Sequence, residues 1–136
     1  MADRGAHLIL YVRDPGRARA FYRALLGEDP VLDVPGMTEF ELSPKTWLGL
    51  MPSQGIRRLL GDVLPDPDAG HGVPRAEVYL RVRDPDAWYA RALELGAKAL
   101  SPAEPRDWGD RVAYCLDLDG HVLAFAGALE VNAPSA

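Results

Sequence analysis

Few side chains in this sequence could act as nucleophiles, acids or bases, and their surroundings argue against that role. Cys115 is the only cysteine and lies beside Ala113 in a strand-like stretch, which is typical of a small buried residue rather than an activated thiolate. His121 ends an Asp-Gly-His turn and His71 lies in a Gly-rich stretch, so we expect neither to be catalytic. The sequence has neither a Gly-rich phosphate loop nor a serine-hydrolase elbow.

A second group of polar and aromatic side chains lies at alternating positions of strand-like segments. Alternation with period two places every second side chain on one face of a strand. In the first predicted strand, this alternation groups His7, Ile9 and Tyr11, and in the strand 70 residues later it groups Glu77, Tyr79 and Arg81. We expect both groups to face a groove, together with Glu39 and Glu41 from a neighbouring strand. Imidazole and carboxylate groups could bind a cation, and the aromatic rings could contact a flat ligand.

Composition limits the classes of protein to consider. The 136 residues are 48% hydrophobic and 26% charged, which favours one globular domain over residues 1–136. The net charge of -5 lacks the basic footprint of a nucleic-acid binder. A single cysteine cannot form an intrachain disulfide, and no signal peptide or membrane span is evident. We therefore expect a cytoplasmic protein with no nucleic-acid or membrane partner.

The sequence contains an internal repeat. Val12-Arg13-Asp14-Pro15 recurs 70 residues later as Val82-Arg83-Asp84-Pro85. In each copy an alternating segment precedes this motif, and an Ala-, Arg- and Leu-rich segment follows it and ends before a glycine, as amphipathic helices do. The predicted strands are 7–12, 31–34, 38–42 and 46–51 in the first copy, and 77–82, 98–100, 111–116 and 122–126 in the second, with helices over 16–26 and 86–95.

This order predicts a βαβββ unit that occurs twice. Repeat one spans 5–51 and repeat two spans 76–128, with a C-terminal tail over 129–136. Residues 52–75 between them are rich in Pro, Gly and Asp and are predicted to be a linker with one short helix at 56–61. We expect an α+β fold of two curved, mostly antiparallel sheets around a groove, with the helices outside.

With these features the sequence resembles the vicinal oxygen chelate superfamily, which includes glyoxalase I, extradiol dioxygenases and metal-free bleomycin-resistance proteins. The resemblance covers nearly the whole chain and is specific for the fold rather than for a reaction. It rests on four segments: the first strand with its Asp-Pro and helix through Gly27, the helix end at 90–96, Trp108-Gly109-Asp110-Arg111, and Asp117-Leu118-Asp119-Gly120-His121.

The resemblance implies metal ligands at four positions, which here are His7, Gly49, Glu77 and Ala124. Only His7 and Glu77 can bind a metal, whereas a catalytic divalent site normally uses three protein ligands. We therefore expect no metal and no other cofactor, with His7 hydrogen-bonded to Glu77. The alternative is a metal-dependent lyase, isomerase or dioxygenase in which Glu41 or a residue of a second subunit is a third ligand, although Glu41 could instead pair with Arg81 or Arg111.

We thus interpret the chain as a metal-independent small-molecule-binding protein that sequesters an antibiotic or an aromatic metabolite, and we lean against an enzyme. With Gly49 and Ala124 at its centre, the groove should have room for a flat ligand, and its carboxylates could neutralise a basic drug. Trp108 either contacts ligand or covers the sheet. A homodimer is expected, and a protein-interaction module remains open. The candidate ligand-binding residues are His7, Tyr11, Glu41, Trp47, Glu77, Tyr79, Arg81, Trp108 and Arg111.

Overall fold

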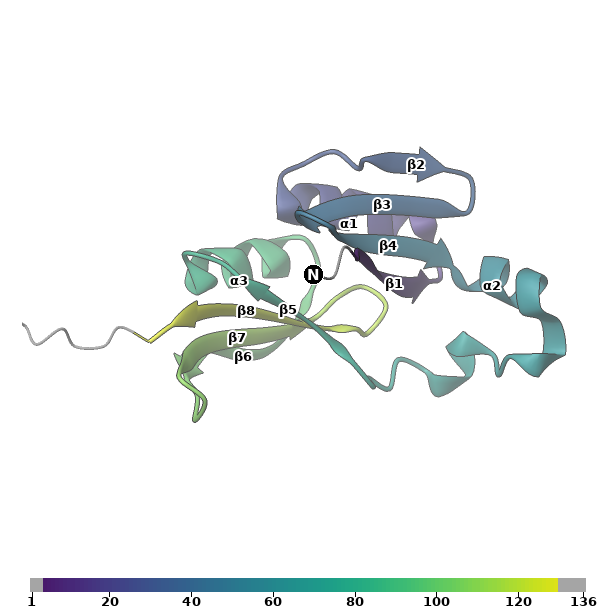
Figure 1. Cartoon of the computed structure of the whole chain (residues 1–136). Helices are drawn as coiled ribbons and strands as arrows, with labels where there is room; N and C mark the ends of the chain where they lie inside the picture. The colour runs from purple at the N-terminus through teal and green to yellow at the C-terminus, as the bar shows by residue number, and fades with distance from the viewer. Residues whose placement is uncertain (1–3, 130–136) are drawn as a thin grey trace, which may run out of the picture. The chain divides into compact units, whose positions relative to one another are not determined.

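The computed structural model describes residues 4–129 of the chain. These residues form two compact units, one that ends at Val73 and one that begins at Pro74. Each unit contains one four-stranded sheet, and the predicted α+β architecture with a βαβββ pattern in each repeat is confirmed (Figure 1). Apart from Leu129, the tail predicted over 129–136 lies outside the described residues.

The first unit is built on a mixed sheet with the strand order β1-β4-β3-β2. β1 and β4 run parallel, because the chain crosses over through α1 between them, and the other two pairs are antiparallel. A parallel pair requires such a crossover. The elements are β1 (Ala6–Val12), α1 (Pro15–Leu26), β2 (Leu32–Val34), β3 (Met37–Ser43) and β4 (Thr46–Pro52).

Helix α1 begins and ends where the sequence predicts. The side chain of Asp14 accepts a hydrogen bond from the backbone N–H of Arg17 at 3.1 Å, and Pro15 occupies the first turn. Gly27 ends the helix with a left-handed φ of 71°, a conformation that glycine adopts without strain. The helix buries Ala18, Phe21, Tyr22 and Leu25 at helical spacing, and the sheet contributes Leu10, Val12, Phe40, Leu48 and Leu50 to the buried core.

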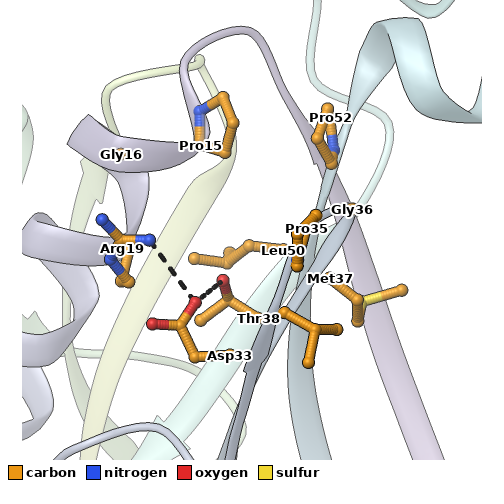
Figure 2. Close-up of a pocket in the computed structure, with 11 residues that line it drawn as sticks. Pro15, Gly16, Arg19, Asp33, Pro35, Gly36, Met37, Thr38, Leu50 and Pro52 are labelled. Atoms are coloured by element: carbon orange, nitrogen blue, oxygen red, sulfur yellow. Dashed lines mark hydrogen bonds and ion pairs between the residues drawn. The ribbon is translucent and has the colours of Figure 1, made fainter.

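The packing leaves a pocket between the first turn of α1 and the hairpin that joins β2 to β3 (Figure 2). Its volume is about 410 Å³. Residues Leu50 and Thr38 lie opposite each other in the sheet and are both buried. The pocket therefore lies on the helix-covered side of the sheet, away from His7.

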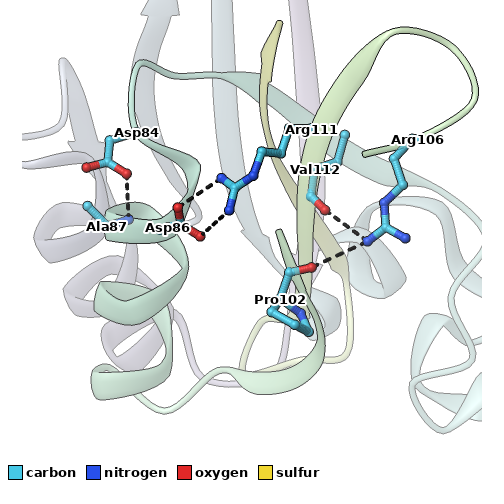
Figure 3. Close-up of polar contacts among 7 residues, drawn as sticks. All are labelled: Asp84, Asp86, Ala87, Pro102, Arg106, Arg111 and Val112. Carbon is cyan, nitrogen blue, oxygen red and sulfur yellow. Dashed lines mark hydrogen bonds and ion pairs between the residues drawn. The ribbon is translucent and has the colours of Figure 1, made fainter. Parts of the chain in front are cut away.

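The second unit repeats the topology of the first. Its strand order is β5-β8-β7-β6, with β5 and β8 parallel. Asp84 begins the helix by accepting a hydrogen bond from the backbone N–H of Ala87 at 3.2 Å (Figure 3). The elements are β5 (Glu77–Arg81), α3 (Pro85–Glu94), β6 (Lys98–Pro105), β7 (Asp110–Leu116) and β8 (Val122–Ala128). Strand β6 is longer than the stretch 98–100 that the sequence predicts.

The segment after β4 is more ordered than a linker. It contains one α-helix and two short 3₁₀ helices: α2 (Ser53–Leu60), η1 (Gly61–Val63) and η2 (Pro67–Gly70). The hydroxyl of Ser53 donates to Asp68 at 3.0 Å and ties the start of α2 to η2. The prediction of one short helix at 56–61 was thus too sparse. Within residues 4–129, no helix has both the length and the apolar character needed to cross a membrane.

Candidate functional site: the open faces of the two sheets

One face of each sheet is covered by its helix, and we call the opposite face the open face. In the first unit, strand alternation and register place His7 next to Trp47 and Ile9 next to Gly49 on this face. The ring of His7 stacks on Trp47, with 4.6 Å between ring centroids and 20° between planes. Two residues that the sequence assigns to ligand binding are therefore brought together.

A carboxylate from β3 reaches His7 across the intervening strand. Glu39 lies beside Gly49 in the register, and its Oε2 is 2.8 Å from Nδ1 of His7. The side chain of Glu39 is only 16% exposed, whereas that of His7 is 44% exposed. Gly49 has no side chain to separate the two, so β1 and β3 make direct side-chain contact over β4.

The space above Gly49 is not open, although we expected room for a ligand there. A Cβ atom at this position would lie 3.1 Å from Cγ1 of Ile9 and 3.3 Å from Sδ of Met37. Side chains of the neighbouring strands have therefore closed over the position. Glu41, the third metal ligand considered from the sequence, is exposed and lies opposite Trp47. Glu39, not Glu41, is the carboxylate that contacts His7, and it is absent from the set of predicted ligand-binding residues.

On the open face of the second unit, a buried carboxylate organises the polar side chains. Asp110 is 5% exposed and accepts hydrogen bonds from the hydroxyl of Tyr79 and from both terminal nitrogens of Arg81, at 3.1 and 2.8 Å. The indole N–H of Trp108 donates to the Tyr79 hydroxyl at 3.0 Å. Three predicted residues thus meet around Asp110, which the sequence-based reasoning did not select.

These contacts change the protonation properties of the network. Hydrogen bonds from Arg81 and from Tyr79 lower the pKa of Asp110 below its usual value. Desolvation, followed by the hydrogen bond to Asp110, raises the pKa of Tyr79. Tyr79 therefore remains a neutral phenol near pH 7, where it can donate a hydrogen bond but cannot act as a nucleophile.

Ala124 lies between two tyrosines at the centre of the same face. The register aligns it with Tyr79 on one side and Tyr114 on the other, and both rings pack against a buried cluster of Ala124, Ala126 and Val112. Ala124 has no exposed surface. As at Gly49, neighbouring side chains fill the position and leave no open centre.

Arg111 does not belong to this set. Its guanidinium forms two hydrogen bonds with Asp86 of α3, at 2.9 and 3.1 Å (Figure 3). Because Asp110 and Val112 point to the open face, Arg111 points to the helix-covered face. Neither arginine pairs with Glu41, since Arg81 binds Asp110 and Arg111 binds Asp86.

The remaining candidates lie apart from these clusters. Tyr11 is 36% exposed at the far end of the first open face. Glu77 begins β5 next to Val122, on the face that bears Tyr79, and is exposed.

Cys115 is fully buried, and desolvation raises the pKa of its thiol to about 12, which agrees with a structural role. His121 contacts both carboxylate oxygens of Asp117 in the predicted turn.

The residues at the four implied metal positions do not fit a catalytic divalent ion. Gly49 and Ala124 carry no side-chain donor atom, and the space around each is filled by neighbours. Within either unit, the described residues bring together no three His, Cys, Asp or Glu side chains that could hold a metal. Nδ1 of His7 is occupied by Glu39, which leaves only Nε2 of this ring as a metal-binding atom.

Comparisons with known proteins agree with this fold. The Glyoxalase/Bleomycin resistance protein/Dioxygenase superfamily profile matches residues 4–125. A glyoxalase-related enzyme from Fulvimarina pelagi is 21% identical, with a TM-score of 0.77 over 93% of this chain and 88% of that one. A glyoxalase/bleomycin resistance protein from Catenulispora acidiphila is 27% identical, with a TM-score of 0.64 over 93% and 99%.

A third solved structure, a glyoxalase/bleomycin resistance protein/dioxygenase from Nocardioides, is 25% identical, with a TM-score of 0.69 over 96% of this chain and 87% of that one. No curated protein matches the sequence. The family match extends over both βαβββ units and includes the strands that carry His7 and Tyr79. The chain therefore belongs to the Glyoxalase/Bleomycin resistance protein/Dioxygenase superfamily.

Proposed function

We propose that this protein binds a small aromatic or heterocyclic molecule without a metal and sequesters it, as an antibiotic-binding or metabolite-binding member of its superfamily. One observation carries the proposal: two positions at which relatives would place metal ligands are Gly49 and Ala124, and neighbouring side chains fill the space at both. Because neither position supplies a side-chain ligand, a function that needs no metal is favoured.

The aromatic side chains of the open faces support a flat ligand. Trp47 is held by its stack on His7, and Trp108 is held by its hydrogen bond to Tyr79 although the residue is 60% exposed. An ordered, exposed indole offers a large contact surface at little cost in conformational entropy. Each tryptophan is the ring contact that we propose for a ligand on its own open face.

The unpaired charges on the open faces favour a basic ligand. Arg81 and Asp110 neutralise each other, and the carboxylate of Glu39 is already in contact with His7. Glu41 and Glu77 are exposed, and within residues 4–129 neither has an ion-pair or hydrogen-bond partner. A cationic group on the ligand would gain a carboxylate partner on either face.

The test is calorimetry on protein that has been treated with a chelator and dialysed, with proflavine, a planar aromatic cation, and a bleomycin-class glycopeptide as probes. We expect saturable binding of at least one probe with the same dissociation constant before and after chelation. Glu41→Gln or Glu77→Gln should weaken binding by up to about tenfold per lost charge contact. Glu94→Gln, an exposed carboxylate on α3, is the control that should change nothing.

Two results would contradict the proposal. Binding that disappears on chelation and returns with a divalent metal would favour the metal-dependent enzyme instead. Absence of binding by either probe, with no rise in melting temperature, would favour a protein-interaction module with no ligand site.

A further inference from the structure

The pocket beside α1 lies mainly on the helix-covered side of the first sheet (Figure 2), and of its lining residues Met37 also borders Gly49 on the open face. Its volume of about 410 Å³ is within the range of roughly 300 to 1,000 Å³ that small-molecule sites occupy. Its apolar wall consists of Pro15, Val34, Pro35, Met37, Leu50 and Pro52. The pocket is thus large enough for a small ligand with an apolar body.

Two opposite charges face each other in this pocket. Arg19 approaches Oδ1 of Asp33 with one terminal nitrogen, at 3.4 Å. The same oxygen accepts the hydroxyl hydrogen bond of Thr38 at 3.1 Å, and Thr38 is only 4% exposed. Figure 2 shows the side chains of Arg19 and Thr38 pointing toward Asp33. Thr38 therefore fixes the carboxylate in the pocket from the buried side.

Much of the hydrogen-bonding capacity of this pair is unused. Among the described residues, Oδ2 of Asp33 has no donor, and Arg19 has no acceptor other than Oδ1. A 3.4 Å contact is long for a charge-assisted bond, and the two side chains are 42% and 44% exposed. The pair is therefore weak and open to competition by a ligand that satisfies both groups better.

A ligand with a single charge would satisfy one partner and leave the other without compensation. A molecule that carries an ammonium and a carboxylate close together would satisfy both partners with charge-assisted hydrogen bonds, so the pocket favours such a molecule. The first turn of α1 borders the pocket through Pro15 and Gly16, and its positive dipole end adds to the attraction of a carboxylate near Arg19.

We propose that this pocket binds a zwitterionic α-amino acid with an apolar side chain. The carboxylate pairs with the guanidinium of Arg19, the ammonium donates to Oδ2 of Asp33, and the side chain lies against the proline- and leucine-lined wall. The site differs from the one proposed above, because neither His7, Glu41 nor Trp47 lines this pocket.

Calorimetry with L-phenylalanine and two analogues tests the recognition of both charges. Phenylalanine should bind with one-to-one stoichiometry, whereas phenethylamine, which lacks the carboxylate, and 3-phenylpropanoate, which lacks the ammonium, should each bind at least about tenfold more weakly. Analogues that bind as tightly as phenylalanine, or the absence of saturable binding by phenylalanine, would overturn the proposal.

Paired variants test the residues. Arg19→Met and Asp33→Asn should each weaken phenylalanine binding at least about tenfold. The controls are Arg23→Met and Asp29→Asn, which break a second exposed arginine–aspartate pair of α1 and the loop after it, outside the pocket. If the pocket variants bind as the wild type does, or if the controls lose binding equally, the assignment is wrong.

A measurement on the wild-type protein covers the case in which a variant does not fold. In a titration with phenylalanine followed by NMR, the backbone amides of Gly16 and Gly36, which line the pocket, should shift most. Shifts centred on the Trp47 indole instead would place the ligand on the open face and overturn the pocket assignment. Failure here leaves the calorimetry of the open-face probes unaffected, so the two proposals can fail separately.

Discussion

Asp110 determines how Tyr79 and Arg81 are presented on the open face of the second sheet. Its negative charge, together with desolvation of the ring, raises the pKa of Tyr79. Replacing Asp110 with Asn keeps the shape but removes the charge, so we expect the pKa of Tyr79 to fall toward its usual value of 10.0. Ultraviolet difference titration against a Tyr79→Phe variant isolates this one phenol.

The chain supplies a matched control for this measurement. Asp86 binds Arg111 through two hydrogen bonds in the same unit but on the opposite face. Asp86→Asn should therefore leave the titration of Tyr79 unchanged. Identical titrations of Tyr79 in the wild type and in Asp110→Asn would show that the Asp110 carboxylate does not raise the pKa of this phenol.

The carboxylate of Asp110 also makes the free energy of unfolding depend on pH in the acid range. Because the folded-state pKa of Asp110 lies below its usual value of 3.8, its contribution is fully present above that value and is lost as the pH falls through the lower, folded-state pKa. The melting temperature of Asp110→Asn should accordingly decline less steeply below about pH 4 than that of the wild type. Parallel melting curves across that range would contradict this expectation.

Cys115 should be unreactive in the native protein. It is fully buried, and desolvation raises the pKa of its thiol to about 12, so the thiolate is scarce at pH 8 and reagents cannot reach it. Labelling with a thiol reagent should proceed in guanidinium chloride but not in buffer. Rapid stoichiometric labelling of the native protein would indicate an accessible, activated cysteine.

At the scale of elements, the two Asp-Pro motifs set where the helices begin. Asp14 and Asp84 each accept a backbone hydrogen bond from the residue three positions later. Asp14→Ala removes this N-cap and should lower the free energy of unfolding by about 1 kcal/mol. Chemical denaturation measures the change, and Glu28→Ala, an exposed residue after α1, should have little effect. An unchanged free energy of unfolding for Asp14→Ala would rule out this capping role.

The elements could be predicted because their signals are local. Alternating apolar residues, the Asp-Pro start and the glycine end lie within a few positions of one another, and the helices and strands of both repeats follow these signals closely. The elements of segment 52–75 were harder to predict, because η1 and η2 are single turns that show no periodic pattern in the sequence.

The side-chain contacts of the site could be predicted only in part. Alternation placed His7, Tyr79 and Arg81 on open faces, but it cannot say which carboxylate reaches each of them. Glu39 and Glu41 share one face, and only the register with Gly49 distinguishes them. Arg111 was predicted to bind ligand, but it alternates with Asp110 and Val112 along β7 and therefore points to the helix-covered face, where it binds Asp86.

At the scale of the whole molecule, the repeat has preserved the topology of the two units while their open faces have diverged. Both sheets have the same strand order, and each begins with a strand that bears one implied metal-binding residue, His7 or Glu77. The last strand of each repeat bears Gly49 or Ala124 in place of a donor. These two positions are the basis of the metal-independent binding that we propose.

Metal content measures this central claim most directly. Protein purified without chelators from cells grown in metal-replete medium should contain far less than one equivalent of zinc, nickel, manganese or iron by elemental analysis. One equivalent of a divalent metal, lost when His7 and Glu77 are both replaced by Ala, would contradict the account and establish a metal site in this chain.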